Sequence, residues 1–272
     1  MQFLVRGLRI RYPVQQRWAV NGVDLEIVPG QVTWLTGALG SGTSTLLLAL
    51  AGLIPRLTGG EREGSVVAAD LDVSTLSPLS HGIGYLGPSP ELQISGIAKT
   101  VRDEVAVGPM NLGRSREQIL HATDDALRRL GIEHLAGRDP GALSGGETQR
   151  VLIASLFAAA PRALLLDEPF SALDRASSAL VQDLLRQVAS EGATVVIACD
   201  DADAMLEIAD RLIVLRDGQV ALDGQPRELL AGDAILALGA GTTDAATLAQ
   251  RSGYAAPRPV TRAELLARIS HD

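Results

Sequence analysis

The chain has 272 residues, enough to bury a sizeable core as one large α/β unit with an appendage or as two small domains. Its formal net charge of −8 argues against nucleic acid as the main partner, and the single cysteine, Cys199, excludes an internal disulfide and fits a reducing compartment. The longest apolar run, Leu152 to Leu166, is broken by Pro161 and Arg162 and is too short to cross a bilayer. No basic segment followed by an apolar one comes after Met1, so we expect a soluble, cytoplasmic chain without a signal peptide.

The first part of the chain is expected to be rich in strands. Residues 1–36 alternate short apolar runs with turns, a pattern typical of antiparallel strands. Tyr12 comes just before the second of these strands, and its spacing alone predicts an edge aromatic packed on the sheet. Residues 44–53 are predicted to form a helix that ends before a proline, and further strands are expected near 65–69 and 83–86.

A helical section follows, and strands then alternate with helices. Ser115 and Gln118 predict a capping box for a helix that ends at Gly131. The other expected elements are a helix at 100–107, a helix from about 145 to 160, a strand at 163–166, a helix from 175 to 190, a strand at 193–198, a helix ending at 209, and strands at 212–215 and 219–222. This alternation predicts a mainly parallel sheet with crossover helices, followed from residue 225 by helices and loops.

One glycine-rich stretch between an apolar run and a helix is expected to bind phosphate. Such a turn aims several backbone N–H groups at one point in front of a helix N-terminus, where the helix dipole also favours an anion. The spacing is that of the P-loop, except that Thr43 occupies the position of its lysine. The candidate residues are Gly37, Gly40, Ser41, Gly42, Thr43, Ser44 and Thr45. The sequence thus predicts a phosphate cradle without its fixed positive charge.

Acidic residues follow two of the later predicted strands. Ligands of α/β sheets lie at the carboxyl ends of the strands, where Asp167, Glu168 and Asp200 are expected. The first carboxylate of an Asp-Glu pair can hold Mg²⁺, here together with the hydroxyl of Ser44, and the second can orient or deprotonate an attacking water. A lone Asp-Glu pair is usually a helix cap, but the phosphate loop upstream favours the site.

A second anion cradle is predicted where Ser144, Gly145 and Gly146 begin a helix. A single nucleotide cannot easily use both cradles of one subunit. We therefore expect the second cradle to serve a nucleotide that another subunit holds.

These motifs resemble those of a known family. Residues 143–174 are similar to the signature motif, Walker B strand and D-loop of ATP-binding cassette (ABC) ATPases, and residues 37–45 to their Walker A loop. The likeness covers about residues 1–224. Residues 100–109 resemble the cobalt-type and energy-coupling-factor (ECF) importers, as does the tail around Pro259, Val260 and Thr261.

The resemblance implies an α/β fold with a P-loop NTPase core of mainly parallel sheet. It also implies an N-terminal antiparallel β-subdomain and an inserted helical subdomain at about 90–160. Residues 1–224 would form the ATP-binding domain, and residues 225–272 would form a small C-terminal helical extension that helps two ATPase subunits pair.

The resemblance further implies roles for individual residues. Tyr12 would stack on the adenine of ATP, Ser44 and Asp167 would serve Mg²⁺, and Glu168 would be the catalytic carboxylate. Ser144, Gly145 and Gly146 would close over the ATP of a second ABC ATPase subunit. A transmembrane coupling protein would hold the pair at the cytoplasmic face of the cell membrane, where it would power uptake of a vitamin or metal ion.

Three positions depart from the family pattern. Thr43 replaces the Walker lysine, Pro88 replaces the Q-loop glutamine although Gln93 still matches the ECF pattern, and Asp200 replaces the switch histidine. Each change removes support for the γ-phosphate, so we expect impaired hydrolysis in the chain's own site. A non-catalytic nucleotide-binding regulator, a soluble cassette protein and an exporter subunit remain open as alternatives.

Overall fold

The structure is a computed structural model that describes residues 1–75 and 81–270. Its strands are β1 (Phe3–Arg11), β2 (Val20–Ile27), β3 (Val32–Gly37), β4 (Glu61–Ala68), β5 (Leu71–Asp72), β6 (Ile83–Leu86), β7 (Ala163–Asp167), β8 (Thr194–Ala198), β9 (Arg211–Arg216) and β10 (Gln219–Gly224). Its α-helices are α1 (Thr43–Leu50), α2 (Val101–Asn111), α3 (Arg116–Arg129), α4 (Gly145–Ala159), α5 (Arg175–Ser190), α6 (Ala202–Leu206), α7 (Pro226–Ala231), α8 (Ala234–Ala237), α9 (Asp244–Arg251) and α10 (Arg262–Ile269). Short 3-10 helices lie at Val73–Thr75, Pro90–Leu92, Glu133–Leu135 and Pro140–Ala142.

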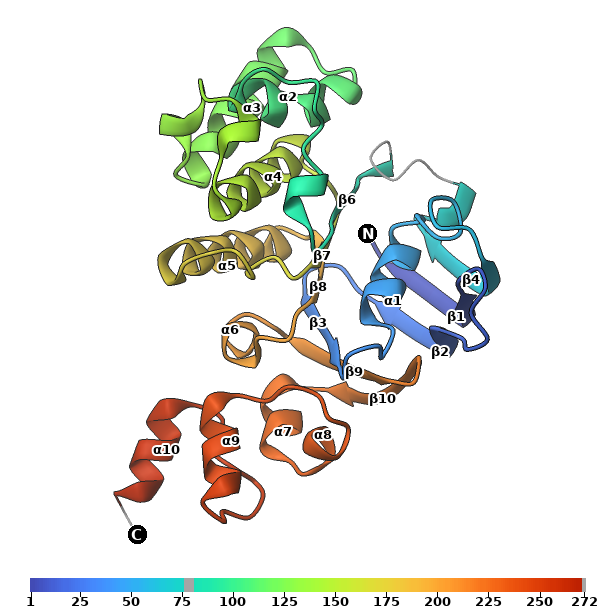
Figure 1. The fold of residues 1–272 in the computed structure, drawn as a ribbon, viewed down its shortest axis with the longest axis vertical. Helices are drawn as coiled ribbons and strands as arrows, with labels where there is room; N and C mark the ends of the chain where they lie inside the picture. Colours follow the sequence, from blue (N-terminus) through green and yellow to red (C-terminus); the bar gives the residue numbers. More distant parts are fainter. Residues whose placement is uncertain (76–80, 271–272) are drawn as a thin grey trace.

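The strands form two sheets, as Figure 1 shows. An antiparallel sheet has the order β2-β1-β4-β5, and a second sheet has the order β10-β9-β3-β8-β7-β6. In the second sheet every neighbouring pair is parallel except β9 and β10, which form an antiparallel hairpin. The expected fold class is therefore confirmed: a mainly parallel core sheet joined to an N-terminal antiparallel sheet.

The strand β3 differs from the sequence-based expectation for residues 1–36. It does not join the antiparallel strands β1 and β2, but lies between β8 and β9 and runs parallel to both. All side chains from Val32 to Thr36 are buried, as is usual for a central parallel strand covered on both faces. The phosphate loop therefore leaves the middle of the core sheet.

Successive side chains of β3 point to opposite faces of the core sheet and so belong to two different hydrophobic layers. Trp34 points into the layer that contains α5 and the buried faces of α2, α3 and α4, whereas Leu35 packs with Leu46, Leu47 and Leu50 of α1. The same layer as α1 contains the inner face of the antiparallel sheet. Helix α1 is thus held between the two sheets, which fixes the loop in front of it.

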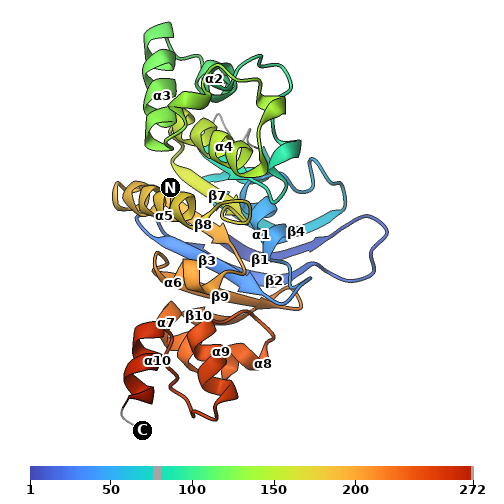
Figure 2. The ribbon, with the colours of Figure 1, turned by 60° about the vertical axis from the view of Figure 1, so that its left-hand side comes forward.

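Two groups of helices lie at the periphery of the molecule. Helices α2, α3 and α4 lie together at one end of the molecule, and α7 to α10 lie at the other end (Figures 1 and 2). Helix α2 extends to Asn111, past the predicted end at residue 107, with Pro109 in its last turn. Within residues 1–75 and 81–270, no helix combines the length and the apolarity needed to cross a membrane.

Candidate functional site

A cavity of about 890 Å³ opens at the carboxyl ends of β3, β7 and β8. It brings together almost all of the predicted residues of the chain's own site: Tyr12, Gly37, Gly40, Gly42, Thr43, Ser44, Thr45, Pro88, Asp167, Glu168 and Asp200. The loop residue Ser41 does not line the cavity: it is 5% exposed, and its backbone nitrogen donates to the carbonyl of Ala38 at 2.9 Å. Lys99, the only lysine of the chain, does not line the cavity.

Close backbone packing fixes the glycines of the phosphate loop. A Cβ on Gly37 would lie 2.3 Å from the carbonyl oxygen of Leu215, and a Cβ on Gly42 would lie 2.2 Å from that of Ala19. Gly42 also has a φ of 103°, which side chains rarely adopt. It precedes α1, whose first turn receives no side-chain cap. The N–H groups of this turn therefore remain available to an anion.

Asp167 ends β7 beneath this loop. It is 3% exposed, and its Oδ2 has no hydrogen-bond partner among the described residues. Burial raises the pKa of Asp167, the Asp200 charge raises it further, and a hydrogen bond with Ser44 opposes both. Mg²⁺ is commonly bound by one or two carboxylates together with substrate phosphates. The orphan oxygen beside Ser44 fits such an ion: Asp167 and Ser44 would hold it, and it would neutralise negative charge there.

Glu168 is held at the junction of β7 and β8. Its backbone has a φ of 51°, and its nitrogen donates to the carbonyl of Ala198 at 2.8 Å. Burial raises the pKa of its carboxyl group, and the charge of Asp200 raises it further. Asp200 itself accepts a 3.4 Å hydrogen bond from the hydroxyl of Thr36. A carboxylate thus stands at the place where the resemblance predicts a histidine.

Tyr12 follows β1 directly and is half-buried against α1. Its hydroxyl lies 3.1 Å from Oγ1 of Thr45, within hydrogen-bond distance. The neighbouring Tyr85 has a raised pKa, because of burial first and then because of Asp167 and Tyr12. The aromatic ring expected to contact a base is therefore placed beside the phosphate loop rather than only on a sheet edge.

The segment after β6 shows what replaces the expected glutamine. Pro88 lines the cavity but has no side-chain amide. The nearby Gln93 accepts from the Gly87 nitrogen at 3.1 Å and donates to the Gly87 carbonyl at 3.1 Å. Gln93 therefore holds the backbone of this segment and does not reach the cavity.

The second predicted cradle is separate from the cavity. Ser144 caps α4 in a capping box: its Oγ accepts from the Glu147 backbone nitrogen at 3.4 Å, and its own backbone nitrogen donates to the Glu147 carboxylate at 2.8 Å. The Ser144 Oγ also donates to that carboxylate at 2.9 Å. These hydrogen bonds, and the Arg138 guanidinium at 2.8 Å, lower the pKa of Glu147. Ser144 and Gly145 are exposed, and neither they nor Gly146 line the cavity. The second predicted cradle is thus exposed on the surface of this chain.

Several residues that the sequence analysis did not assign to the site also line the cavity. They are Gln15, Arg17, Trp18, Ala19, Asn21, Ala38, Leu39, Ala198, Cys199 and Asp217. Arg17 and Trp18 come from the loop between β1 and β2, and Asp217 from the turn between β9 and β10. The one signal for Arg17 in the sequence is its position as a cation shortly after Tyr12.

Comparison with known proteins agrees with this geometry. The model of the family described as "ABC transporter" matches residues 20–171, which is more than half of the chain. The chain belongs to the ABC transporter family. Within this ABC cassette, the match covers the phosphate loop, the exposed Ser144 cradle and the Asp167-Glu168 pair.

Individual relatives support the same conclusion. The energy-coupling factor transporter ATP-binding protein EcfA2 of Methanospirillum hungatei is 38% identical over 228 residues, which are 82% of this ABC cassette and 55% of EcfA2. The chain spans about half the length of several curated relatives that it matches, including 48% of each of two putative ABC transporter ATP-binding proteins of Saccharolobus solfataricus.

Two solved structures share the fold. The first is cbiO1 from Clostridium perfringens, part of the ABC transporter complex cbiONQ, with 29% identity, a TM-score of 0.72, and coverage of 86% of this chain and 92% of that one. The second is a dimeric ATP-binding cassette in a post-hydrolysis state with ADP and Pi, with 25% identity, a TM-score of 0.73, and coverage of 82% and 98%.

Proposed function

We propose that this chain is the nucleotide-binding subunit of an ECF-type membrane importer and that it pairs with a second ABC ATPase subunit. Its signature segment, Ser144 to Glu147, would close over the ATP that the partner holds. Its own cavity would bind ATP and Mg²⁺ but hydrolyse ATP poorly. The observation that carries the proposal is the contrast between an intact, exposed second cradle and an altered cavity.

The altered cavity accounts for the expected loss of hydrolysis. A charge-assisted hydrogen bond is worth roughly 1.5–3 kcal/mol, and two are missing at Thr43 and Pro88. A carboxylate at Asp200 adds repulsion toward a phosphate. Together these changes amount to on the order of 3–6 kcal/mol, or several powers of ten in rate if the terms add. Glu168 would remain as the carboxylate facing the attacking water, and Ser44 and Asp167 as the ligands of Mg²⁺.

The names of the relatives support the proposed setting. EcfA2 is named for an energy-coupling factor transporter, and cbiO1 is described as part of a transporter complex. By analogy, a transmembrane coupling protein would hold this chain at the cytoplasmic face of the membrane, as a peripheral subunit that powers uptake of a vitamin or metal ion.

The C-terminal extension, proposed as residues 225–272, would contribute to subunit pairing. Ala245, Ala249 and Leu265 form its small buried cluster. Leu248, Leu266 and Ile269 are each 53% exposed on α9 and α10. Apolar side chains left exposed on a small helical unit favour association with another subunit.

The test is ATP hydrolysis by the chain alone and by its purified membrane complex, with and without Ser144→Arg. We expect little hydrolysis by the isolated chain, robust hydrolysis in the complex, and loss of that activity in the variant. Ser115→Arg is the matched control, because Ser115 is also an exposed serine in a capping box but lies on α3. Hydrolysis by the isolated chain at ordinary rates would refute the proposal, and no hydrolysis by the wild-type complex would favour the regulator.

A further inference from the structure

The charged residues that line the cavity are strongly unbalanced. Among the described residues, four carboxylates line it, those of Asp167, Glu168, Asp200 and Asp217, whereas Arg17 is the one Arg or Lys side chain that does so. Like charges repel strongly where water is partly excluded. A polyphosphate entering this cavity therefore needs a positive charge in addition to the backbone N–H groups of the loop.

Arg17 comes from a loop that rests on the start of α1. Ala19, two residues further on, approaches Gly42 so closely that a Cβ there would lie 2.2 Å from the Ala19 carbonyl oxygen. Gly42 directly precedes Thr43, the residue at the lysine position. Strand β2, which directly follows this loop, is tied to the β9–β10 hairpin, since the backbone nitrogen of Asn21 donates to the Gly218 carbonyl at 2.8 Å. The backbone that carries Arg17 is therefore anchored next to the phosphate loop.

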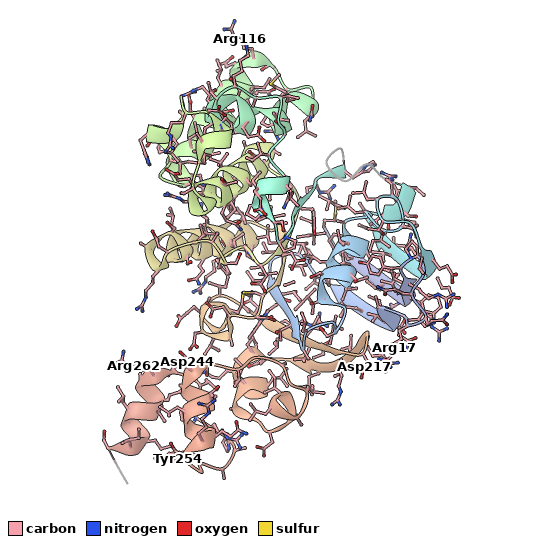
Figure 3. All side chains as sticks on the ribbon, viewed as in Figure 1. Arg17, Arg116, Asp217, Asp244, Tyr254 and Arg262 are labelled. Atoms are coloured by element: carbon pink, nitrogen blue, oxygen red, sulfur yellow. The ribbon has the colours of Figure 1, made fainter. Side chains whose placement is uncertain are left out.

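The guanidinium of Arg17 is not engaged elsewhere. Arg17 is exposed and makes no hydrogen bond or ion pair with another described residue. By contrast, Arg11 pairs with Glu61 at 2.6 Å and lies 4.9 Å from the Trp18 ring. Asp217, the carboxylate labelled near Arg17 in Figure 3, has its own partner in Arg216 at 3.7 Å. Arg17 is thus free to turn toward a ligand in the cavity.

We propose that Arg17 binds the phosphates of the nucleotide in this cavity and supplies the positive charge that Thr43 lacks. The inference rests on the proposed function, since it takes a nucleotide as the ligand. Two parallel N–H groups of a guanidinium can bind two phosphate oxygens at once. The long side chain allows the charge to come from the β1–β2 loop instead of from α1. Because Arg17 is exposed, its contribution decreases as salt concentration rises.

The experiment measures binding to the full chain by calorimetry, with ATP and inorganic tripolyphosphate as probes. The variants are Arg17→Gln, Arg17→Lys and the control Arg6→Gln. Arg6 is an exposed arginine on β1 that does not line the cavity. We expect Arg17→Gln to weaken binding of both probes by about tenfold or more at low salt. Arg17→Lys retains part of the affinity, and Arg6→Gln binds like the wild type.

Three results would overturn the inference. The first is equal binding by Arg17→Gln and Arg6→Gln. The second is weaker binding of ATP but not of tripolyphosphate, because Arg17 would then contact the nucleoside. The third is a wild-type chain that binds neither probe. The role of the signature segment is tested separately by hydrolysis in the complex with Ser144→Arg, so the two proposals can fail independently.

Discussion

The backbone nitrogen of Asp200 donates a 3.0 Å hydrogen bond to Oε1 of Glu168. This bond joins the end of β8 to the end of β7 and fixes the carboxylate that the family resemblance assigns to catalysis. The side chain of Asp200 acts in the opposite sense, since its charge contributes to the raised pKa values of both Glu168 and Asp167. Asp200 thus positions Glu168 through its own backbone nitrogen, while the charge of the Asp200 side chain opposes ionisation of the Glu168 carboxyl group.

This coupling predicts the pH dependence of stability in Asp200→Asn. A raised pKa means that the folded state binds the proton more tightly than the unfolded chain does, so stability decreases as pH rises from the ordinary carboxyl value to the raised one. Asp200→Asn removes part of that shift and keeps the backbone bond. We expect the variant to gain stability over the wild type as pH rises from about 4 to 7, measured by thermal unfolding.

The control for this prediction is Asp217→Asn. Asp217 lines the same cavity but does not contribute to the raised pKa of Glu168 or Asp167. The thermal stability of Asp217→Asn should change with pH in parallel with that of the wild type. If the Asp200→Asn profile is parallel as well, the charge coupling at the end of β8 is absent.

Restoring the lysine predicts a gain in nucleotide affinity. Thr43→Lys places a charged donor beside the loop, and a charge-assisted hydrogen bond of about 1.5–3 kcal/mol corresponds to roughly 10- to 100-fold tighter ATP binding. Calorimetry on the isolated chain checks this, with Thr43→Ala as the control that adds no charge. Hydrolysis should stay low, because Pro88 and Asp200 are unchanged. Equal affinities of the Lys and Ala variants would contradict the prediction.

Local patterns made much of this architecture predictable from the sequence. The capping box predicted at Ser115 involves residues three positions apart, and it is present in the structure. The phosphate loop and its helix are likewise encoded within about ten residues. Such features depend on hydrogen bonds and glycine conformations that a short window of sequence contains.

Contacts between distant segments were not predictable in this way. The position of β3 depends on pairing with β8 and β9, more than 150 residues away in the chain. Arg17 and Asp217 reach the cavity from two turns that only the folded sheets bring together. Gln93 has a side chain suited to a ligand, and only its two hydrogen bonds to Gly87 reveal its structural use.

The contributions of the Tyr12 hydroxyl and of its aromatic ring can be separated by substitution. Tyr12→Phe removes only the hydroxyl that lies 3.1 Å from Thr45, whereas Tyr12→Ala removes the ring as well. Stacking of a base on an aromatic ring is worth about 1–3 kcal/mol. We expect Tyr12→Ala to weaken ATP binding by roughly tenfold or more and Tyr12→Phe to bind nearly normally.

Tripolyphosphate provides the control for this prediction, because it has no base to stack. Its affinity should be the same in the wild type and in Tyr12→Ala. If Tyr12→Ala binds ATP normally, Trp18, the tryptophan that lines the cavity, becomes the aromatic to test.

The packing of the signature segment against Ala172, in the loop between β7 and α5, predicts a steric effect at Gly146. A Cβ on Gly146 would lie 2.8 Å from the carbonyl oxygen of Ala172, so backbone atoms must move to accept it. Gly145 is the matched control, because its Cβ would meet the Ala172 side chain at an ordinary 3.9 Å. Overpacking of this kind typically lowers the free energy of unfolding by about 1–3 kcal/mol. Denaturant unfolding should show that loss for Gly146→Ala and little change for Gly145→Ala.

The same pair distinguishes stability from assembly of the partner's site. Because a Cβ on Gly146 would meet the Ala172 carbonyl oxygen, accepting it shifts the signature segment, which is proposed to close over the partner's nucleotide. Hydrolysis by the complex should therefore fall in Gly146→Ala even at temperatures where the variant is fully folded. Full activity of that folded variant would mean that the contact with Ala172 serves stability alone.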